Sequence, residues 1–184
     1  MGINSKELWT ESAEVHFLRT RRGTAAQADQ AFATYDTLTD LSVDERALDI
    51  WDLDLFILQA PRDGIADQLG ELGEWVASVT VFGQVRDALR IAERVDGDSA
   101  AFLVNIDVFG PLEQAVDVLL SLRRTNPKLT ILVMSSEFVR DDTSLERSAI
   151  ADASLRLPLT PDRLRDGLYC AAENTKLRQL GLAL

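Results

Sequence analysis

The chain has 184 residues, of which 46% are hydrophobic and 27% are charged, which is typical of a globular protein with a buried core. Its formal net charge of −11 would repel a polyanion, so we expect no direct binding of nucleic acid. No apolar run reaches the roughly 20 residues that a membrane helix needs, and the single cysteine excludes an internal disulfide. These features predict a cytoplasmic protein that makes no contact with a membrane.

Residues 1–51 are more polar than the rest and are predicted to form an N-terminal, mainly helical extension. Ser42-Val43-Asp44-Glu45 has the spacing of a capping box, which predicts a helix from about residue 43 to 51. The stretch 14–19 fits a helix or a short strand, and we favour a helix. We expect this extension to mediate dimerisation or to bind a partner. The main domain is predicted to span 52–174, and 175–184 to form the end of the last helix or a linker.

Short apolar bursts follow Asp52 and alternate with amphipathic segments. Because the bursts lack strict alternation, they suit strands that are buried on both faces of a parallel sheet. The predicted strands are 55–58, 76–82, 101–106, 129–134 and 153–157.

Apolar stripes between the bursts recur at helical spacing. Thr160-Pro161 provides a capping hydroxyl and a first-turn proline, which predicts that the last helix begins there and runs to about residue 180. Five strands and four or five helices indicate a doubly wound α/β fold with a parallel sheet, whose functional site lies at the carboxyl ends of the strands. The predicted stripes are Ile65, Leu69 and Leu72; Val85, Leu89 and Ala92; Leu112, Ala115, Val116, Leu119, Leu120 and Leu122; and Leu164, Leu168, Ala171 and Ala172.

Three of the predicted strand ends carry a distinctive residue. The third burst ends in Asp107 with Pro111 four residues later, the fourth ends in Ser135, and the fifth ends in Leu157-Pro158 before a helix that begins Thr-Pro-Asp-Arg-Leu. In this order and spacing, residues 52–174 resemble the CheY-like receiver domain of bacterial two-component response regulators. The resemblance implies a signal-transduction module in which a histidine kinase phosphorylates Asp107 within a phosphorelay.

The chemistry of that family needs charged groups that this sequence lacks. The metal is held by the phosphoacceptor aspartate and an acidic pair after the first strand, and those positions fall on Gln59 and Ala60. A lysine normally ends the fifth strand, and its position falls on Leu157. Since metal and lysine neutralise the transferring phosphoryl group, we expect little or no metal-dependent phosphorylation. We therefore predict no metal, no cofactor and no enzymatic activity.

Other interpretations remain open from the sequence. Asp107 could cap the turn before Pro111, and Ser135 could be a simple turn residue. The favoured function is a pseudo-receiver that acts through protein–protein contacts, as a homodimer or with a histidine kinase or an output domain. The first alternative is a receiver that is still phosphorylated on Asp107 through a distorted site. A small α/β ligand-binding protein or enzyme is the alternative of another class, although no glycine-rich phosphate loop follows any predicted strand.

Overall fold

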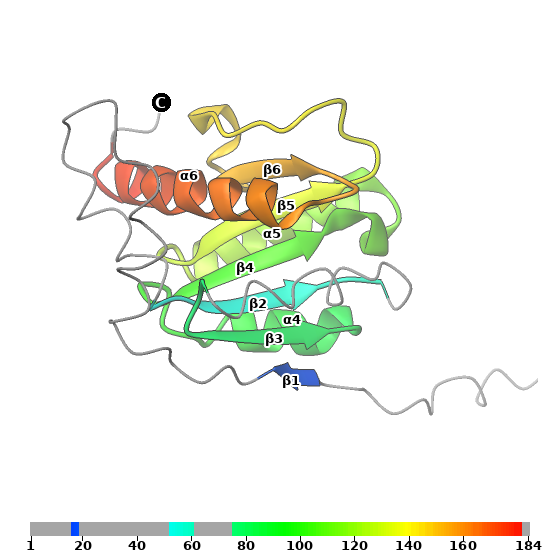
Figure 1. Ribbon diagram of the computed structural model, residues 1–184, viewed down its shortest axis with the longest axis horizontal. Coiled ribbons are helices and arrows are strands. Elements are labelled where there is room, and N and C mark those ends of the chain that lie inside the picture. Colours follow the sequence, from blue (N-terminus) through cyan, green and yellow to red (C-terminus); the bar gives the residue numbers. More distant parts are fainter. Residues whose placement is uncertain (1–15, 19–51, 61–74, 182–184) are drawn as a thin grey trace, which may run out of the picture.

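The computed structural model describes residues 16–18, 52–60 and 75–181 (Figure 1). Its sheet has six strands in the order β1-β3-β2-β4-β5-β6, and all neighbouring strands except β1 and β3 are parallel. This confirms the predicted doubly wound, five-stranded parallel sheet, to which one antiparallel strand is added. The parallel strands are β2 (Asp54–Leu58), β3 (Ser78–Phe82), β4 (Ala100–Asn105), β5 (Thr130–Ser135) and β6 (Ala153–Arg156).

The sixth strand, β1 (His16–Leu18), corrects the helical interpretation of the stretch 14–19. It pairs antiparallel with β3, with His16 opposite Val81 and Leu18 opposite Val79. The unpaired N–H and C=O groups of an edge strand offer hydrogen bonds to another segment, and this tertiary pairing overrides the local pattern. The rest of the predicted extension, including the capping box at Ser42, lies outside the described residues.

Helices cover both faces of the sheet. Helix α6 (Pro161–Gln179) lies on one face, and α4 (Val85–Ala92) and α5 (Leu112–Thr125) lie on the other (Figure 1). The predicted start of α6 is confirmed, because the Thr160 hydroxyl accepts a hydrogen bond from the Arg163 N–H at 3.4 Å and Pro161 occupies the first turn. The helix predicted around Ile65 lies outside the described residues. None of the described helices has the length and apolar character to cross a bilayer.

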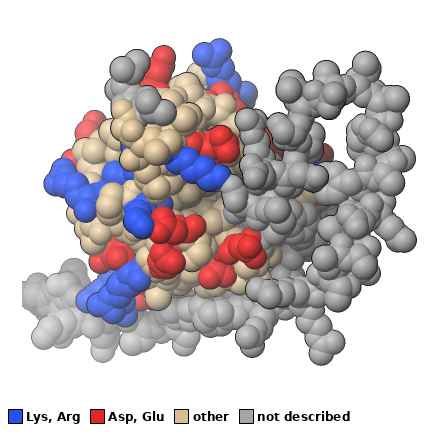
Figure 2. All heavy atoms as spheres, turned by 90° about the vertical axis from the view of Figure 1, so that its left-hand side faces the viewer, with Lys and Arg blue, Asp and Glu red and all other residues tan. Residues whose placement is uncertain are grey.

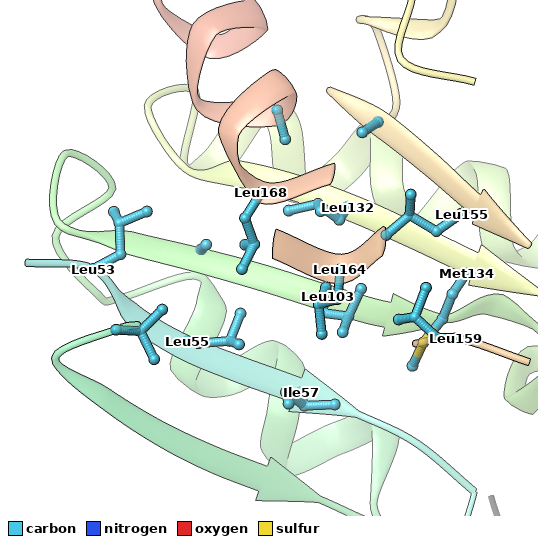
Figure 3. Packing of buried hydrophobic residues seen from close by; sticks show 14 of the residues in the cluster. Leu53, Leu55, Ile57, Leu103, Leu132, Met134, Leu155, Leu159, Leu164 and Leu168 are labelled. Atoms are coloured by element: carbon cyan, nitrogen blue, oxygen red, sulfur yellow. The ribbon is translucent and has the colours of Figure 1, made fainter. Parts of the chain in front are cut away.

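The core beneath α6 joins the middle of the sheet to the first half of that helix (Figure 3). Leu55, Ile57 and Leu103 from the sheet are fully buried together with Leu164 and Leu168 from α6. Full burial of one such side chain contributes roughly 1.5–3 kcal/mol, so this layer is a major stabilising contact.

The second core lies beneath α4 and α5. Ala88 of α4 and Leu119 of α5 are buried in one cluster with Phe102 and Ile131 of the sheet. Leu112, which the predicted stripe placed inward, is 61% exposed. It is the first residue of α5, and the first buried residue of the helix, Ala115, comes one turn later.

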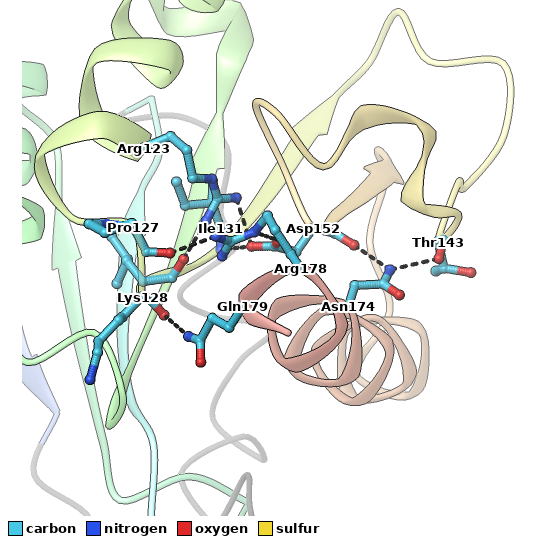
Figure 4. A network of polar contacts seen from close by, with 10 residues as sticks. Arg123, Pro127, Lys128, Ile131, Thr143, Asp152, Asn174, Arg178 and Gln179 are labelled. Carbon is cyan, nitrogen blue, oxygen red and sulfur yellow. Dashed lines mark hydrogen bonds and ion pairs between the residues drawn. The ribbon is translucent and has the colours of Figure 1, made fainter. Parts of the chain in front are cut away.

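A buried polar network fixes the amino ends of β5 and β6 to the end of α6 (Figure 4). Asp152 has no exposed surface and accepts hydrogen bonds from Arg123 at 2.8 Å, from Arg178 at 3.0 Å and from the Ile131 N–H at 2.8 Å. Asn174 donates to the Asp152 carbonyl at 2.7 Å. The C-terminal half of α6 is thus held by polar contacts.

The connection between β5 and β6 contains no α-helix, only a short 3-10 turn at Leu145–Arg147. Instead, Asp142 pairs antiparallel with Ser154, and each backbone N–H donates to the other's carbonyl, at 2.8 and 2.7 Å. We call residues 136–144 the edge segment, because they close the outer edge of β6. The five parallel strands are therefore flanked by β1 on one side and by the edge segment on the other.

Candidate functional site

Asp107 lies in a 3-10 turn, Ile106–Phe109, that follows directly after β4. The side chain of the buried residue Asn105 caps this turn, since its Oδ1 accepts a hydrogen bond from the Asp107 N–H at 2.9 Å. No side-chain hydrogen bond caps the start of α5, where Pro111 is the capping residue. The Asp107 carboxylate thus has no capping role at this turn or at α5, and it faces the end of the neighbouring strand β5.

Two consecutive serines at the end of β5 hold the Asp107 carboxylate. The Ser135 hydroxyl donates to Oδ1 at 2.5 Å. The Ser136 N–H and hydroxyl both donate to Oδ2, at 3.0 and 2.8 Å. The structure therefore brings together the two residues that the sequence predicted, Asp107 and Ser135, and adds Ser136. The only sequence signal for Ser136 is that it directly follows Ser135 and is also a serine.

These hydrogen bonds determine the protonation of the carboxyl group. Partial burial alone would raise the pKa of Asp107, but the hydrogen bonds from Ser135 and Ser136 outweigh it, and the pKa lies below its ordinary value. Asp107 is exposed. Because its pKa is lowered, its carboxylate is ionised at neutral pH.

The predicted acidic-pair positions, Gln59 and Ala60, lie directly after β2 and are half-buried. The Gln59 N–H donates to the Phe82 carbonyl at 3.1 Å, which continues the pairing of β2 with β3. Neither side chain can supply a carboxylate. Within the residues that the structure describes, no group of three His, Cys, Asp or Glu side chains is arranged to hold a metal ion.

Leu157, at the predicted lysine position, comes one residue after β6. Its N–H donates to the Ser135 carbonyl at 2.9 Å, and its half-buried side chain packs against the core beneath α6. The neighbouring Arg156 is exposed, and its guanidinium donates to the Val139 carbonyl at 3.2 Å. The cation beside Leu157 is therefore bonded to the edge segment.

The edge segment connects the Asp107 site to α6. It begins at Ser136, which contacts Asp107, and its Asp141 carboxylate receives two hydrogen bonds from the Arg163 guanidinium, at 2.5 and 2.9 Å. Asp141 also accepts the Arg156 N–H at 2.7 Å. The hydrogen bonds from Arg163 and Arg156 outweigh partial burial and lower the pKa of Asp141. No local pattern in the sequence predicts this contact, because it joins a loop to a helix that begins some 20 residues later.

Chemically, the site presents one ionised carboxylate whose two oxygens are already hydrogen-bonded. It has no second carboxylate from Gln59 or Ala60 and no ammonium at Leu157. A carboxylate in this setting can organise the ends of β4 and β5, and the described residues Gln59, Ala60 and Leu157 bring no charge that would stabilise a transferring phosphoryl group.

No model of a known protein family and no curated protein matches the chain. Solved structures do match its fold. A CheY-like response regulator receiver domain protein from Methanospirillum hungatei is 16% identical, with a TM-score of 0.50, over 68% of this chain and 98% of that one. The REC domain of AraT, a response regulator from Geobacillus stearothermophilus, is 20% identical over 70% of this chain and 98% of that one, with a TM-score of 0.46. A putative pilus assembly protein from Burkholderia thailandensis is 25% identical over 66% of this chain and 98% of that one, with a TM-score of 0.45. From β2 to α6, the chain thus has the fold of CheY-like receiver domains.

Proposed function

We propose that the chain is a signal-transduction module, a degenerate receiver that acts through contacts with other proteins and not through metal-dependent phosphorylation. The observation that carries this proposal is the setting of Asp107. Its carboxylate is held by Ser135 and Ser136, while Gln59, Ala60 and Leu157 occupy the positions of the charged groups that phosphoryl transfer would need.

The physical reason is electrostatic. A transferring phosphoryl group brings several negatively charged oxygens to a carboxylate that is itself anionic, and the barrier falls only when cations face those oxygens. In a receiver these cations are a divalent metal and a lysine. With no carboxylate at Gln59 or Ala60, the metal loses two of its carboxylate ligands and keeps only Asp107, and Leu157 supplies no charge.

One observation favours the alternative of a receiver that is still phosphorylated. Asp107 is exposed and ionised, so its oxygens are available as a nucleophile once the serine hydrogen bonds break. The proposal requires that these bonds and the missing cations make this step too slow to serve as a signal.

Acetyl phosphate with Mg²⁺ tests the proposal directly. The full chain is incubated with both, next to a phosphorylatable receiver domain as positive control, and its intact mass is measured with time. We expect no phosphoryl group on this chain under conditions that label the control. Labelling that disappears in an Asp107→Asn variant would overturn the proposal and establish the alternative.

The partners in this proposal are proteins: a histidine kinase, an output domain or regulator, or a second copy of the chain. In this view the module has no catalytic residue, and its specificity lies in its surface. The edge segment supports this view, because it replaces a helix with hydrogen-bonded loop structure beside the Asp107 site.

A further inference from the structure

Charge does not mark a docking face at the amino ends of the strands. Lys and Arg side chains lie next to Asp and Glu on the face that Figure 2 shows. Lys128 forms an ion pair with Asp98 at 2.5 Å, and Arg178 is bonded to Asp152 at 3.0 Å. Because these opposite charges offset one another, they give a charged partner little to recognise.

The outer edge of β3 is a surface of another kind, because its backbone can pair with a further strand. β3 reads Ser-Val-Thr-Val-Phe, which has no charge, no proline and three β-branched residues. Val79 and Val81 are buried in the core beneath α6, and Phe82 is buried in the core beneath α4 and α5. Both faces of β3 are thus filled and β2 pairs with one of its sides, so a further strand can add only on the side opposite β2.

An uncharged strand edge of this kind invites pairing with other chains unless it is protected by lysine, by proline or by a cover. β3 contains neither of these residues, and its cover is β1, which pairs antiparallel with Val79–Val81 (Figure 1). The β3 edge is therefore a site that accepts an antiparallel strand, and the sequence His-Phe-Leu of β1 is one that it accepts.

This cover is limited in extent. β1 has three residues and β3 has five, so Ser78 and Phe82 lie outside the register of the pair. A ladder of three residue pairs at the edge of a sheet contains few hydrogen bonds. Such a strand detaches at a much lower cost than a strand in the middle of the sheet.

The connection along the chain does not tie β1 to its own β3. More than 30 residues separate Leu18 from Asp54, where β2 begins. Fully extended, a segment of that length could span roughly 100 Å, so β1 can also reach the β3 edge of another copy. The same residues would meet in the same register, and the hydrogen bonds lost in one pairing would be regained in the other.

We propose that β1 exchanges between two copies of the chain, so that His16–Leu18 of each copy pairs with Val79–Val81 of the other. Exchange of one strand in each direction closes a two-fold dimer. After the first strand has exchanged, the second pairing takes place within the complex, at a high effective concentration. The proposal rests on the proposed function, within which it assigns the contact of the homodimer.

Cysteine trapping in a mixture of two variants tests this exchange. Both variants carry Cys170→Ser, which removes the single native cysteine. One variant also carries Phe17→Cys and the other Thr80→Cys, two positions that lie opposite each other in the register. After mixing and mild oxidation, we expect a disulfide-linked heterodimer that contains one chain of each kind, as measured by intact mass. Its yield should rise with protein concentration, because the exchanged form needs two chains.

The matched control mixes the Phe17→Cys variant with an Arg94→Cys variant that also carries Cys170→Ser. Arg94 is exposed near the end of α4 and Thr80 is buried, so random collision favours the control. We expect about tenfold more heterodimer from the Thr80→Cys mixture, because a paired strand holds the two thiols at a high effective concentration. A yield no greater than that of the control would overturn the proposal.

A single chain with both Phe17→Cys and Thr80→Cys, in the Cys170→Ser background, separates the other outcomes. In dilute solution a disulfide should form within the chain, and disulfide-linked dimers should appear as the concentration rises. A disulfide that stays within the chain at every concentration argues decisively against exchange, as does the absence of any disulfide. If circular dichroism shows that Thr80→Cys does not fold, Leu18→Cys and Val79→Cys, which are also opposite each other, replace the pair. Failure of exchange leaves the proposed function standing, because that function is tested by the phosphoryl labelling of Asp107.

Discussion

The hydroxyl of Ser135 donates a hydrogen bond of 2.5 Å to Oδ1 of Asp107. In the proposed function this hydroxyl, which would hold an oxygen of the phosphoryl group in a phosphorylated receiver, instead holds the carboxylate of Asp107. Together with Ser136 it ties the ends of β4 and β5 to each other. The two residues that resemble a reaction centre in the sequence are thus joined by a contact between the ends of two strands.

Removal of the Ser135 hydroxyl should raise the pKa of Asp107. In Ser135→Ala the carboxylate loses a hydrogen bond that favours its ionised form, while partial burial still opposes ionisation. The ¹³C shift of the Asp107 carboxyl carbon, followed by NMR during a pH titration, measures this change. Ser144→Ala is the matched control, because that serine bonds to Asp142 and should leave Asp107 unaffected. An unchanged titration in Ser135→Ala would contradict the role given to this hydrogen bond.

The lowered pKa of Asp107 also predicts how the stability of the protein depends on pH. Because the folded-state pKa of Asp107 is lowered, its contribution to stability is fully present above the pKa of the unfolded chain. It is lost as the pH falls through the folded-state value, in the acid range below the ordinary aspartate pKa. Urea denaturation at neutral and acid pH should therefore show a smaller acid-induced loss of stability for Asp107→Asn than for the original chain. Equal losses in the two proteins would refute this linkage.

Asp152 should be far more important for stability than an exposed aspartate. Burial lowers the pKa of Arg123, and the charge and hydrogen bond of Asp152 counter that effect. Asp152→Ala leaves the guanidinium groups of Arg123 and Arg178 in the protein without their shared carboxylate, which should cost about 3–5 kcal/mol of unfolding free energy. Asp98→Ala, which removes the exposed partner of Lys128, should cause little change. Urea unfolding of both variants makes the comparison, and similar losses would contradict the structural role of the network.

The edge segment should loosen when Asp141 is removed. Asp141 accepts the Arg156 N–H and two bonds from Arg163, so Asp141→Ala frees the outer edge of β6. Hydrogen exchange measured by NMR should become faster at the Arg156 and Ser154 amides, while amides in the middle of β4 keep their protection. Asp166→Ala, at an exposed position of α6, is the control and should leave both amides unchanged. If Asp141→Ala exchanges like the control, the edge segment is not held by this ion pair.

Restoring the missing charges should restore phosphorylation in part. Gln59→Asp, Ala60→Asp and Leu157→Lys combined would return the carboxylates for a metal and the ammonium for the phosphoryl oxygens. We expect this triple variant, unlike the original chain, to gain a phosphoryl group from acetyl phosphate in a Mg²⁺-dependent manner, as measured by intact mass. Adding Asp107→Asn to the triple variant should abolish the label. A folded triple variant that stays unlabelled would show that more than charge has been lost.

Much of the fold could be predicted because it depends on local patterns. The apolar bursts marked the five parallel strands, and Thr160-Pro161 marked the start of α6. Where the pairing is distant in sequence, the local pattern was insufficient. The strand His16–Leu18 pairs with β3, more than 60 residues later, whereas the stretch 14–19 taken alone fits a helix or a short strand. Leu112 fits a helical stripe, yet it faces solvent because it is the first residue of α5.

The candidate site was likewise predictable only in part. Parallel strands end at one edge of the sheet, so Asp107 after β4 and Ser135 at the end of β5 had to be neighbours. The three-dimensional course of the chain after β5 was not encoded in any short motif. Ser136 could be assigned only once the turn after β5 was known, and the bond between Asp141 and Arg163 only once the edge segment was seen to lie against β6 and α6.

The proposed function requires that Asp107 and its surroundings do not hold the divalent metal on which phosphoryl transfer depends. Titration of the isotope-labelled chain with Mn²⁺, observed by NMR, measures this most directly, because the paramagnetic ion broadens the signals of nearby amides. We expect no selective broadening at Asp107, Ser135 and Gln59 at Mn²⁺ concentrations that broaden the site of a metal-binding receiver domain. Selective broadening of these amides that disappears in Asp107→Asn would contradict it.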